Sequence, residues 1–225
     1  MLNTDRRVSA EISLYYDTFV PKAAKTPAPL LIAVHGYGAH KIYMMREARL
    51  IAPESFALAS IQGPHQFYGK GKNGKYKVTF GWLTDHRSEE SVALHHQFIL
   101  DVIDQLVEDG TADPERIYLF GFSQACALNF RFAFTYPQVL RGIIGVCGGI
   151  PSDLETNEIY SPPEAEVLYL YGNDDEFYPL PKFQAHEEKL RSYLSKFQAI
   201  KYSAQHEITS EMREDMKHWL EMRER

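Results

Sequence analysis

Continuous apolar stretches alternate along the chain with stretches in which apolar residues recur at every third or fourth position. Continuous runs are typical of strands buried on both faces, and the wider spacing is typical of helices with one buried face. The runs predict buried strands at 30–36, 55–63, 116–122, 140–149 and 165–173. The spaced pattern predicts helices at 88–110, 124–136, 181–197 and 209–222. Strands separated by helices form βαβ units, so we expect a mostly parallel sheet with helices on both faces.

Two less regular segments add to this pattern. Residues 7–19 alternate loosely between apolar and polar side chains, which predicts an edge strand or a hairpin. The pair Asn73-Gly74 is a strong turn signal and predicts a hairpin within 68–78. The lysines of this segment lie at positions 70, 72, 75 and 77. The simplest interpretation is that these lysines face solvent and protect a strand edge. The alternative is that they form a basic flap that attracts anionic substrates.

Length, composition and charge narrow the class of protein. The 225 residues contain no repeat or long linker, so we expect a single domain over 1–225. Hydrophobic residues make up 44% and the formal net charge is -6, which disfavours nucleic acid or an anionic membrane as a partner. No apolar run approaches the roughly 20 residues of a membrane span. The start of the chain lacks an apolar signal segment, and the two cysteines fit a reducing compartment, so a cytoplasmic location is expected.

Ser123 lies where a predicted buried strand meets a predicted helix, in the stretch "GFSQA". A nucleophile elbow needs small residues two positions before and two positions after its serine, because the backbones approach closely there. Gly121 and Ala125 occupy those positions, although the usual motif ends in glycine. The pattern therefore predicts a nucleophilic serine; the alternative is a serine that only caps the helix.

A serine nucleophile needs a base and an orienting acid, which in this type of sheet follow it along the chain. Asp174 and Asp175 follow the predicted strand 165–173, and His206 precedes the last predicted helix. The carboxyl ends of parallel strands meet at one edge of the sheet, so these groups can converge on Ser123. Either aspartate could also be a simple turn residue, and His206 could be a solvated loop residue.

Two backbone amides would complete the site by binding the oxyanion of the reaction. One amide belongs to Gln124, the residue after the serine, and the other to Tyr37 in the loop "HGYGAH". Gly36 and Gly38 let this loop fold close to the serine, although a glycine pair can also form a turn without any ligand.

Five motifs extend the comparison over residues 31–220: "AVHGYG", "QGPHQFY", "GFSQA", "GNDDEFYP" and "QHEITSEM". Together they resemble the phospholipase/carboxylesterase family of serine hydrolases, which includes the acyl-protein thioesterases. The resemblance implies a small α/β-hydrolase without a large lid, with Ser123, Asp175 and His206 as the triad and Tyr37 and Gln124 as oxyanion donors. It also implies that small carboxylic esters or thioesters are cleaved through an acyl-enzyme on Ser123, with no metal and no cofactor.

Aromatic residues near the predicted site could form the substrate pocket or could pack onto the core. The candidates are Trp82, Phe67, Tyr68 and Phe177. The adjacent pair His95-His96 is rejected as a metal site, because neighbouring residues do not share a helix face. Rival functions are a dienelactone-hydrolase-like or peptidase-like enzyme and, in another class, a non-catalytic binding module. A monomer and a homodimer are both compatible with the sequence.

Overall fold

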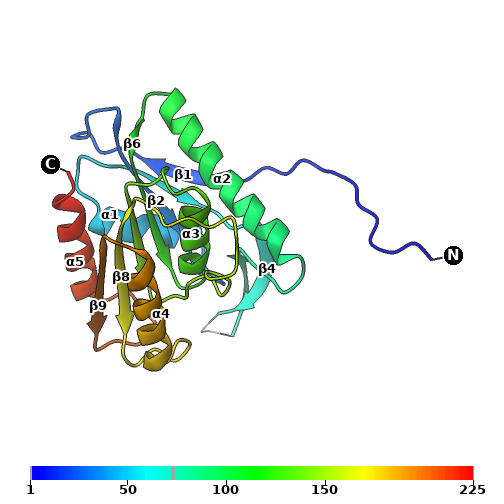
Figure 1. Ribbon diagram of the computed structural model, residues 1–225. Coiled ribbons are helices and arrows are strands. Elements are labelled where there is room, and N and C mark those ends of the chain that lie inside the picture. Colours follow the sequence, from blue (N-terminus) through cyan, green and yellow to red (C-terminus); the bar gives the residue numbers. More distant parts are fainter. Residues whose placement is uncertain (1, 72–73, 225) are drawn as a thin grey trace.

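A mostly parallel sheet forms the centre of the molecule (Figure 1). The computed structural model describes residues 2–71 and 74–224. Within them, seven strands form one sheet in the order β1-β3-β2-β6-β7-β8-β9. Their bounds are Tyr16–Phe19 for β1, Ala28–Val34 for β2, Ala57–Ile61 for β3, Ala112–Phe122 for β6, Gly142–Val146 for β7, Glu166–Gly172 for β8 and Phe197–Tyr202 for β9. Only the edge strand β1 runs antiparallel to its neighbour, so the predicted parallel arrangement is confirmed.

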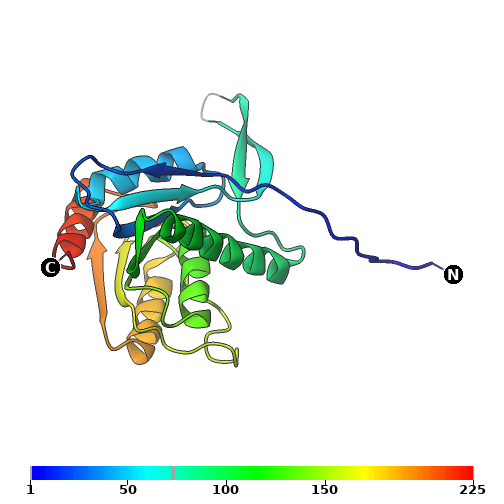
Figure 2. The same cartoon turned by 90° about the horizontal axis from the view of Figure 1, so that it is seen from above.

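Helices cover both faces of this sheet (Figure 2). Their bounds are Lys41–Ile51 for α1, Ser88–Glu108 for α2, Gln124–Thr135 for α3, Leu180–Tyr193 for α4 and Ser210–Glu221 for α5. Helices α1 and α5 pack together on one face, and α2, α3 and α4 lie on the other. The pattern analysis missed α1, although its buried residues Met44, Ala48 and Ile51 have helical spacing. None of these five described helices is long and apolar enough to span a bilayer.

The predicted hairpin is present and stands out from the body of the molecule (Figures 1 and 2). Strands β4 (His65–Lys70) and β5 (Tyr76–Gly81) form a separate antiparallel sheet. Lys72 and Asn73, which belong to the predicted turn, lie outside the described residues. At the base of the hairpin, Phe80 exchanges backbone hydrogen bonds with Gly38 and Ala39. The hairpin is therefore joined directly to the loop that follows β2.

Candidate active site

Ser123 sits at a sharp turn between β6 and α3, with no other residue between the strand and the helix. Its backbone has φ 57° and ψ -119°, a conformation that costs energy for a residue with a side chain. A Cβ on Gly121 would lie 2.6 Å from Nδ2 of Asn129 and 3.2 Å from the carbonyl carbon of Ala125, so a side chain at that position would force the buried Asn129 to move. Ala125, by contrast, is completely buried without needing a glycine. The departure from the usual motif is thus accommodated by the packing.

A chain of hydrogen bonds links the serine to a histidine and an aspartate. Nε2 of His206 lies 2.9 Å from Oγ of Ser123, and Nδ1 lies 2.8 Å from Oδ2 of Asp175. The other oxygen of Asp175 accepts from the amides of Phe177 and Tyr178, both at 2.9 Å. With Nδ1–H donated to the carboxylate, Nε2 keeps its lone pair for the serine hydroxyl. This arrangement can withdraw a proton from Ser123.

The turn after β8 determines which aspartate meets the histidine. Asp175 is 5% exposed and faces His206, whereas the neighbouring Asp174 is exposed. The amide of Asp174 donates to the carbonyl of Ala204, which fixes the turn against the loop that carries His206. Glu176 adds a contact that the sequence did not suggest, because its carboxylate accepts the backbone N–H of His206 at 3.2 Å.

The loop after β2 approaches the serine closely. A Cβ on Gly36 would lie 3.1 Å from Cβ of Ser123, so the glycine permits this approach. Gly38 has φ 72°, and its amide donates to the carbonyl of Phe80 at 2.8 Å. Gln124 is the first residue of α3, so its amide has no partner within the helix. The loop that carries Tyr37 thus lies close to Ser123, and the amide of the next residue, Gln124, is left without a partner in the helix.

The side chain of Gln124 has a role that the sequence did not indicate. Its Oε1 accepts the backbone N–H of Trp82 at 3.0 Å, and its Nε2 donates to the carbonyl of Leu83 at 3.4 Å. The residue that follows Ser123 therefore also holds the segment that comes after the hairpin.

Trp82 lies in the core and not on a pocket wall. Its ring is 1% exposed, and Nε1 donates to the carbonyl of His35 at 2.8 Å. His35 in turn accepts the amide of Gly63 at 2.9 Å through Nε2. Burial lowers the pKa of His35 to about 4, so the ring is neutral and can accept this bond. Of the two alternatives for Trp82, the structure therefore shows packing in the core, where the residue supports the loop that follows β2.

The other three aromatic candidates occupy different positions. Phe177 is 66% exposed, and its ring centroid lies 4.8 Å from that of His206. Phe67 stacks on Tyr37, which lies in the loop that follows β2, with the ring centroids 4.9 Å apart. Tyr68 is 75% exposed and, as the next residue in β4, points to the opposite side of the hairpin from Phe67. Phe177 and Phe67 are therefore near the site, and Tyr68 is turned away.

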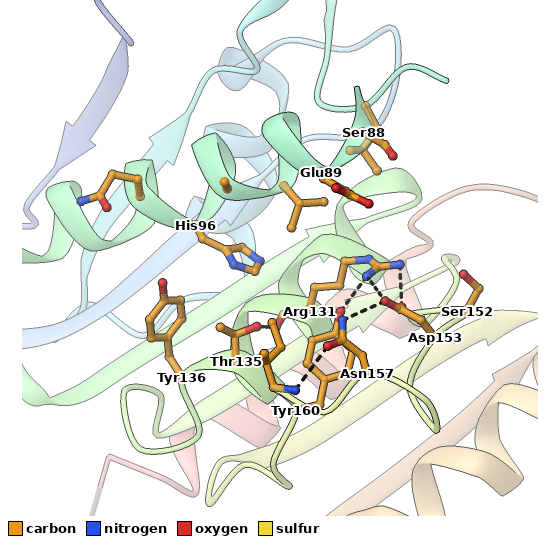
Figure 3. Close-up of a pocket in the computed structure, with 15 residues that line it drawn as sticks. Ser88, Glu89, His96, Arg131, Thr135, Tyr136, Ser152, Asp153, Asn157 and Tyr160 are labelled. Carbon is orange, nitrogen blue, oxygen red and sulfur yellow. Dashed lines mark hydrogen bonds and ion pairs between the residues drawn. The ribbon is translucent and has the colours of Figure 1, made fainter. Parts of the chain in front are cut away.

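A cavity of about 630 Å³ lies between α2, α3 and the 152–160 loop, and neither Ser123 nor His206 lines it (Figure 3). Arg131 binds Asp153 with N–O distances of 2.8 and 2.9 Å, which ties the loop to α3. His96 reaches this cavity from α2 and is almost completely buried. Within the described ranges 2–71 and 74–224, no group of three or more His, Cys, Asp or Glu residues could hold a metal ion.

Comparison with known proteins shows which family the sequence resembles. The family model described as Phospholipase/Carboxylesterase matches residues 16–223. A putative esterase, NocK, from Nocardia uniformis subsp. tsuyamanensis is 28% identical over 159 residues, which is 67% of this chain and 41% of that protein. Acyl-protein thioesterase 1 from Gibberella zeae is 26% identical over 113 residues, which is 48% of each chain. The matched segments thus span less than half the length of these curated relatives.

Solved structures extend the likeness to nearly the whole chain. The crystal structure of esterase PE8 has a TM-score of 0.73 and 20% identity, over 94% of this chain and 99% of that one. At this level of identity the similarity concerns the fold. The fold is that of an α/β-hydrolase, as the sequence predicts.

Proposed function

The chain belongs to the phospholipase/carboxylesterase family, and we propose that it is a serine hydrolase that cleaves carboxylic esters or thioesters. The observation that carries the proposal is the hydrogen-bonded chain from Ser123 Oγ through His206 to Asp175, at 2.9 and 2.8 Å. A serine that only caps α3 would need neither a histidine at its hydroxyl nor a buried carboxylate behind that histidine. The side chain of Ser123 also makes no capping hydrogen bond to the helix.

The proposed reaction begins when Oγ of Ser123 attacks the carbonyl carbon of the ester and its proton passes to Nε2 of His206. The carbonyl oxygen becomes an oxyanion, which the amides of Tyr37 and Gln124 stabilise. The tetrahedral intermediate expels the alcohol or thiol, which takes the proton from His206, and an acyl-enzyme remains on Ser123. Water then attacks this ester in the same way and releases the acid.

Asp175 holds the imidazole in the tautomer that this sequence requires. Its Oδ1 is fixed by two amides, so Oδ2 presents a constant acceptor to Nδ1–H of His206. When His206 takes the serine proton, the positive charge lies beside a buried carboxylate, which lowers the energy of the ion pair.

Labelling with a fluorophosphonate probe tests the proposal. The wild-type protein should be labelled, Ser123→Ala should not, and Ser9→Ala, an exposed serine in the amino-terminal segment, should react like the wild type. Turnover of a p-nitrophenyl ester should fall in Ser123→Ala by a factor of about a million. Circular dichroism and urea unfolding verify that the variant is folded. Labelling or near-wild-type turnover in a folded Ser123→Ala protein would contradict the proposal.

Substrate preference requires a separate panel. p-Nitrophenyl esters of increasing acyl length, together with thioesters of the same acids, would give the relative kcat/KM for chain length and for oxygen against sulfur. The small-molecule ester is the substrate class that the family supports.

A further inference from the structure

A second cavity, of about 430 Å³, lies between α3, α4 and the 149–152 loop. These two helices are neighbours on the same face of the sheet (Figures 1 and 2). Ala127 lines the cavity from α3, and Lys182, His186 and Lys189 line it from α4. This cavity is distinct from the larger one beside α2, although Ser152 borders both.

The cavity adjoins the catalytic groups through Tyr178. This residue lines the cavity, and its ring is nearly parallel to that of His206, with centroids 6.2 Å apart. Its backbone amide also donates to Asp175. Ala127 lies one helical turn after Ser123, so the first turn of α3 leads from the nucleophile to the cavity. Tyr178 thus borders both the cavity and the ring of His206.

The cavity carries positive charge in a protein whose net charge is -6. Lys189 is paired with Glu155 at 3.1 Å. Lys182 has its Nζ 4.9 Å from the ring centroid of Tyr178, and within 2–71 and 74–224 no carboxylate lies at ion-pair distance from it. His186 adds no charge near neutral pH, because burial and the two lysines lower its pKa to about 4. Lys182 is therefore the uncompensated cation at the cavity.

We propose that this cavity is a subsite for a carboxylate group on the ester substrate, bound by Lys182. The inference rests on the proposed esterase function, since it assigns a substrate class to that site. A carboxylate placed here would accept a charge-assisted hydrogen bond from the ammonium group of Lys182. The ester group of the same substrate would extend past Tyr178 to Ser123. The net charge of -6 gives no general attraction for an anionic substrate, so a preference for one requires a local cation such as Lys182.

Matched pairs of esters that differ only in one charge test the subsite. For the acyl side, mono-p-nitrophenyl adipate is compared with p-nitrophenyl hexanoate, which has the same chain without the carboxylate. For the alcohol side, para-acetoxybenzoate is compared with para-acetoxybenzamide. The readout is the ratio of kcat/KM for the anionic and neutral ester, measured at low and at high ionic strength.

The wild type should prefer the anionic ester of at least one pair, about fivefold or more at low salt, and the preference should shrink at high salt. Lys182→Gln should abolish the preference, and Lys182→Arg should largely restore it. Lys217→Gln removes the same charge from α5 on the opposite face of the sheet and should keep the wild-type ratio.

The outcomes separate the two proposals. Ready hydrolysis of the neutral esters without preference for either anionic partner overturns the subsite and leaves the esterase function intact. A preference that survives in Lys182→Gln also overturns it. If no ester is hydrolysed and no fluorophosphonate labelling occurs, the esterase function itself fails, and with it the inference that depends on it.

Discussion

Replacing Asp175 by asparagine should lower turnover by about four orders of magnitude without unfolding the protein. The change is nearly isosteric, but it converts one of two acceptor oxygens into a donor. Oδ1 of Asp175 accepts two backbone amides, and Oδ2 accepts Nδ1–H of His206. An asparagine must therefore direct its single oxygen to one of these two sets of donors.

The structure determines which orientation is favoured. If the amide NH₂ faced the backbone, two partly buried N–H groups would lose their acceptor, at a cost of up to about 1–3 kcal/mol each. The asparagine oxygen should therefore stay on the amides of Phe177 and Tyr178, and its NH₂ should face Nδ1 of His206. The ring must then accept at Nδ1 and carry its proton on Nε2. That tautomer directs a hydrogen at Ser123 Oγ and cannot withdraw the serine proton.

Loss of the correct tautomer in a serine triad costs a factor of ~10⁴ in turnover, which corresponds to about 5.4 kcal/mol of transition-state energy. The assay is kcat on one p-nitrophenyl ester for the wild type, Asp175→Asn, Asp174→Asn and Glu176→Gln. Asp174→Asn changes an exposed side chain and should alter kcat only modestly. Glu176→Gln keeps an oxygen for the His206 amide and should also have a small effect.

Two results would refute this reasoning. The first is an Asp175→Asn protein that keeps turnover within about tenfold of the wild type. The second is a severe loss in Asp174→Asn with little loss in Asp175→Asn, which would reverse the roles of the two aspartates. Urea unfolding of each variant separates a loss of chemistry from a loss of structure.

Three further predictions concern the support of the site, acid stability and the absence of a predicted lid. Gln124→Ala keeps the backbone donor but leaves the Trp82 amide without its acceptor, so stability to urea should fall by about 1–3 kcal/mol. Its turnover should fall less than that of His206→Ala, with partial recovery in Gln124→Glu; equal losses would assign the side chain a direct role. Burial lowers the pKa of His35 and His96 to about 4, so their contribution to stability is complete above pH 6.5 and is lost as the pH falls toward 4. Between about pH 7 and pH 5 each should cost about 2 kcal/mol of unfolding free energy, so the acid-induced loss should be smaller in His96→Gln by about that amount; an unchanged slope would contradict this. Because the sequence predicts no insertion long enough for a lid, short to medium acyl chains should be preferred, and a jump in rate when a long-chain ester forms an emulsion would count against this.

Local sequence was sufficient to predict most of the sheet and the strand-to-helix turn at Ser123. Strands buried on both faces are continuous apolar runs, as in the fully buried β2, so they can be recognised without tertiary information. The elbow is also a local feature, because the atoms that crowd Gly121 belong to Ala125 and Asn129, which follow it closely along the chain. The beginning of β6 was missed by four residues, because the polar residues before Arg116 carry no apolar signal.

Long-range packing decided what the individual side chains do. Neighbouring residues such as Asp174 and Asp175 have the same chemistry, and only the turn held against Ala204 directs one of them to His206. The sequence around Trp82 would be the same whether its ring lined a pocket or packed in the core. The hydrogen bond from its ring to the His35 carbonyl places the side chain in the core. A sequence pattern records which side chains prefer burial. Which atoms they meet depends on distances between segments far apart along the chain, and the tertiary structure alone sets those distances.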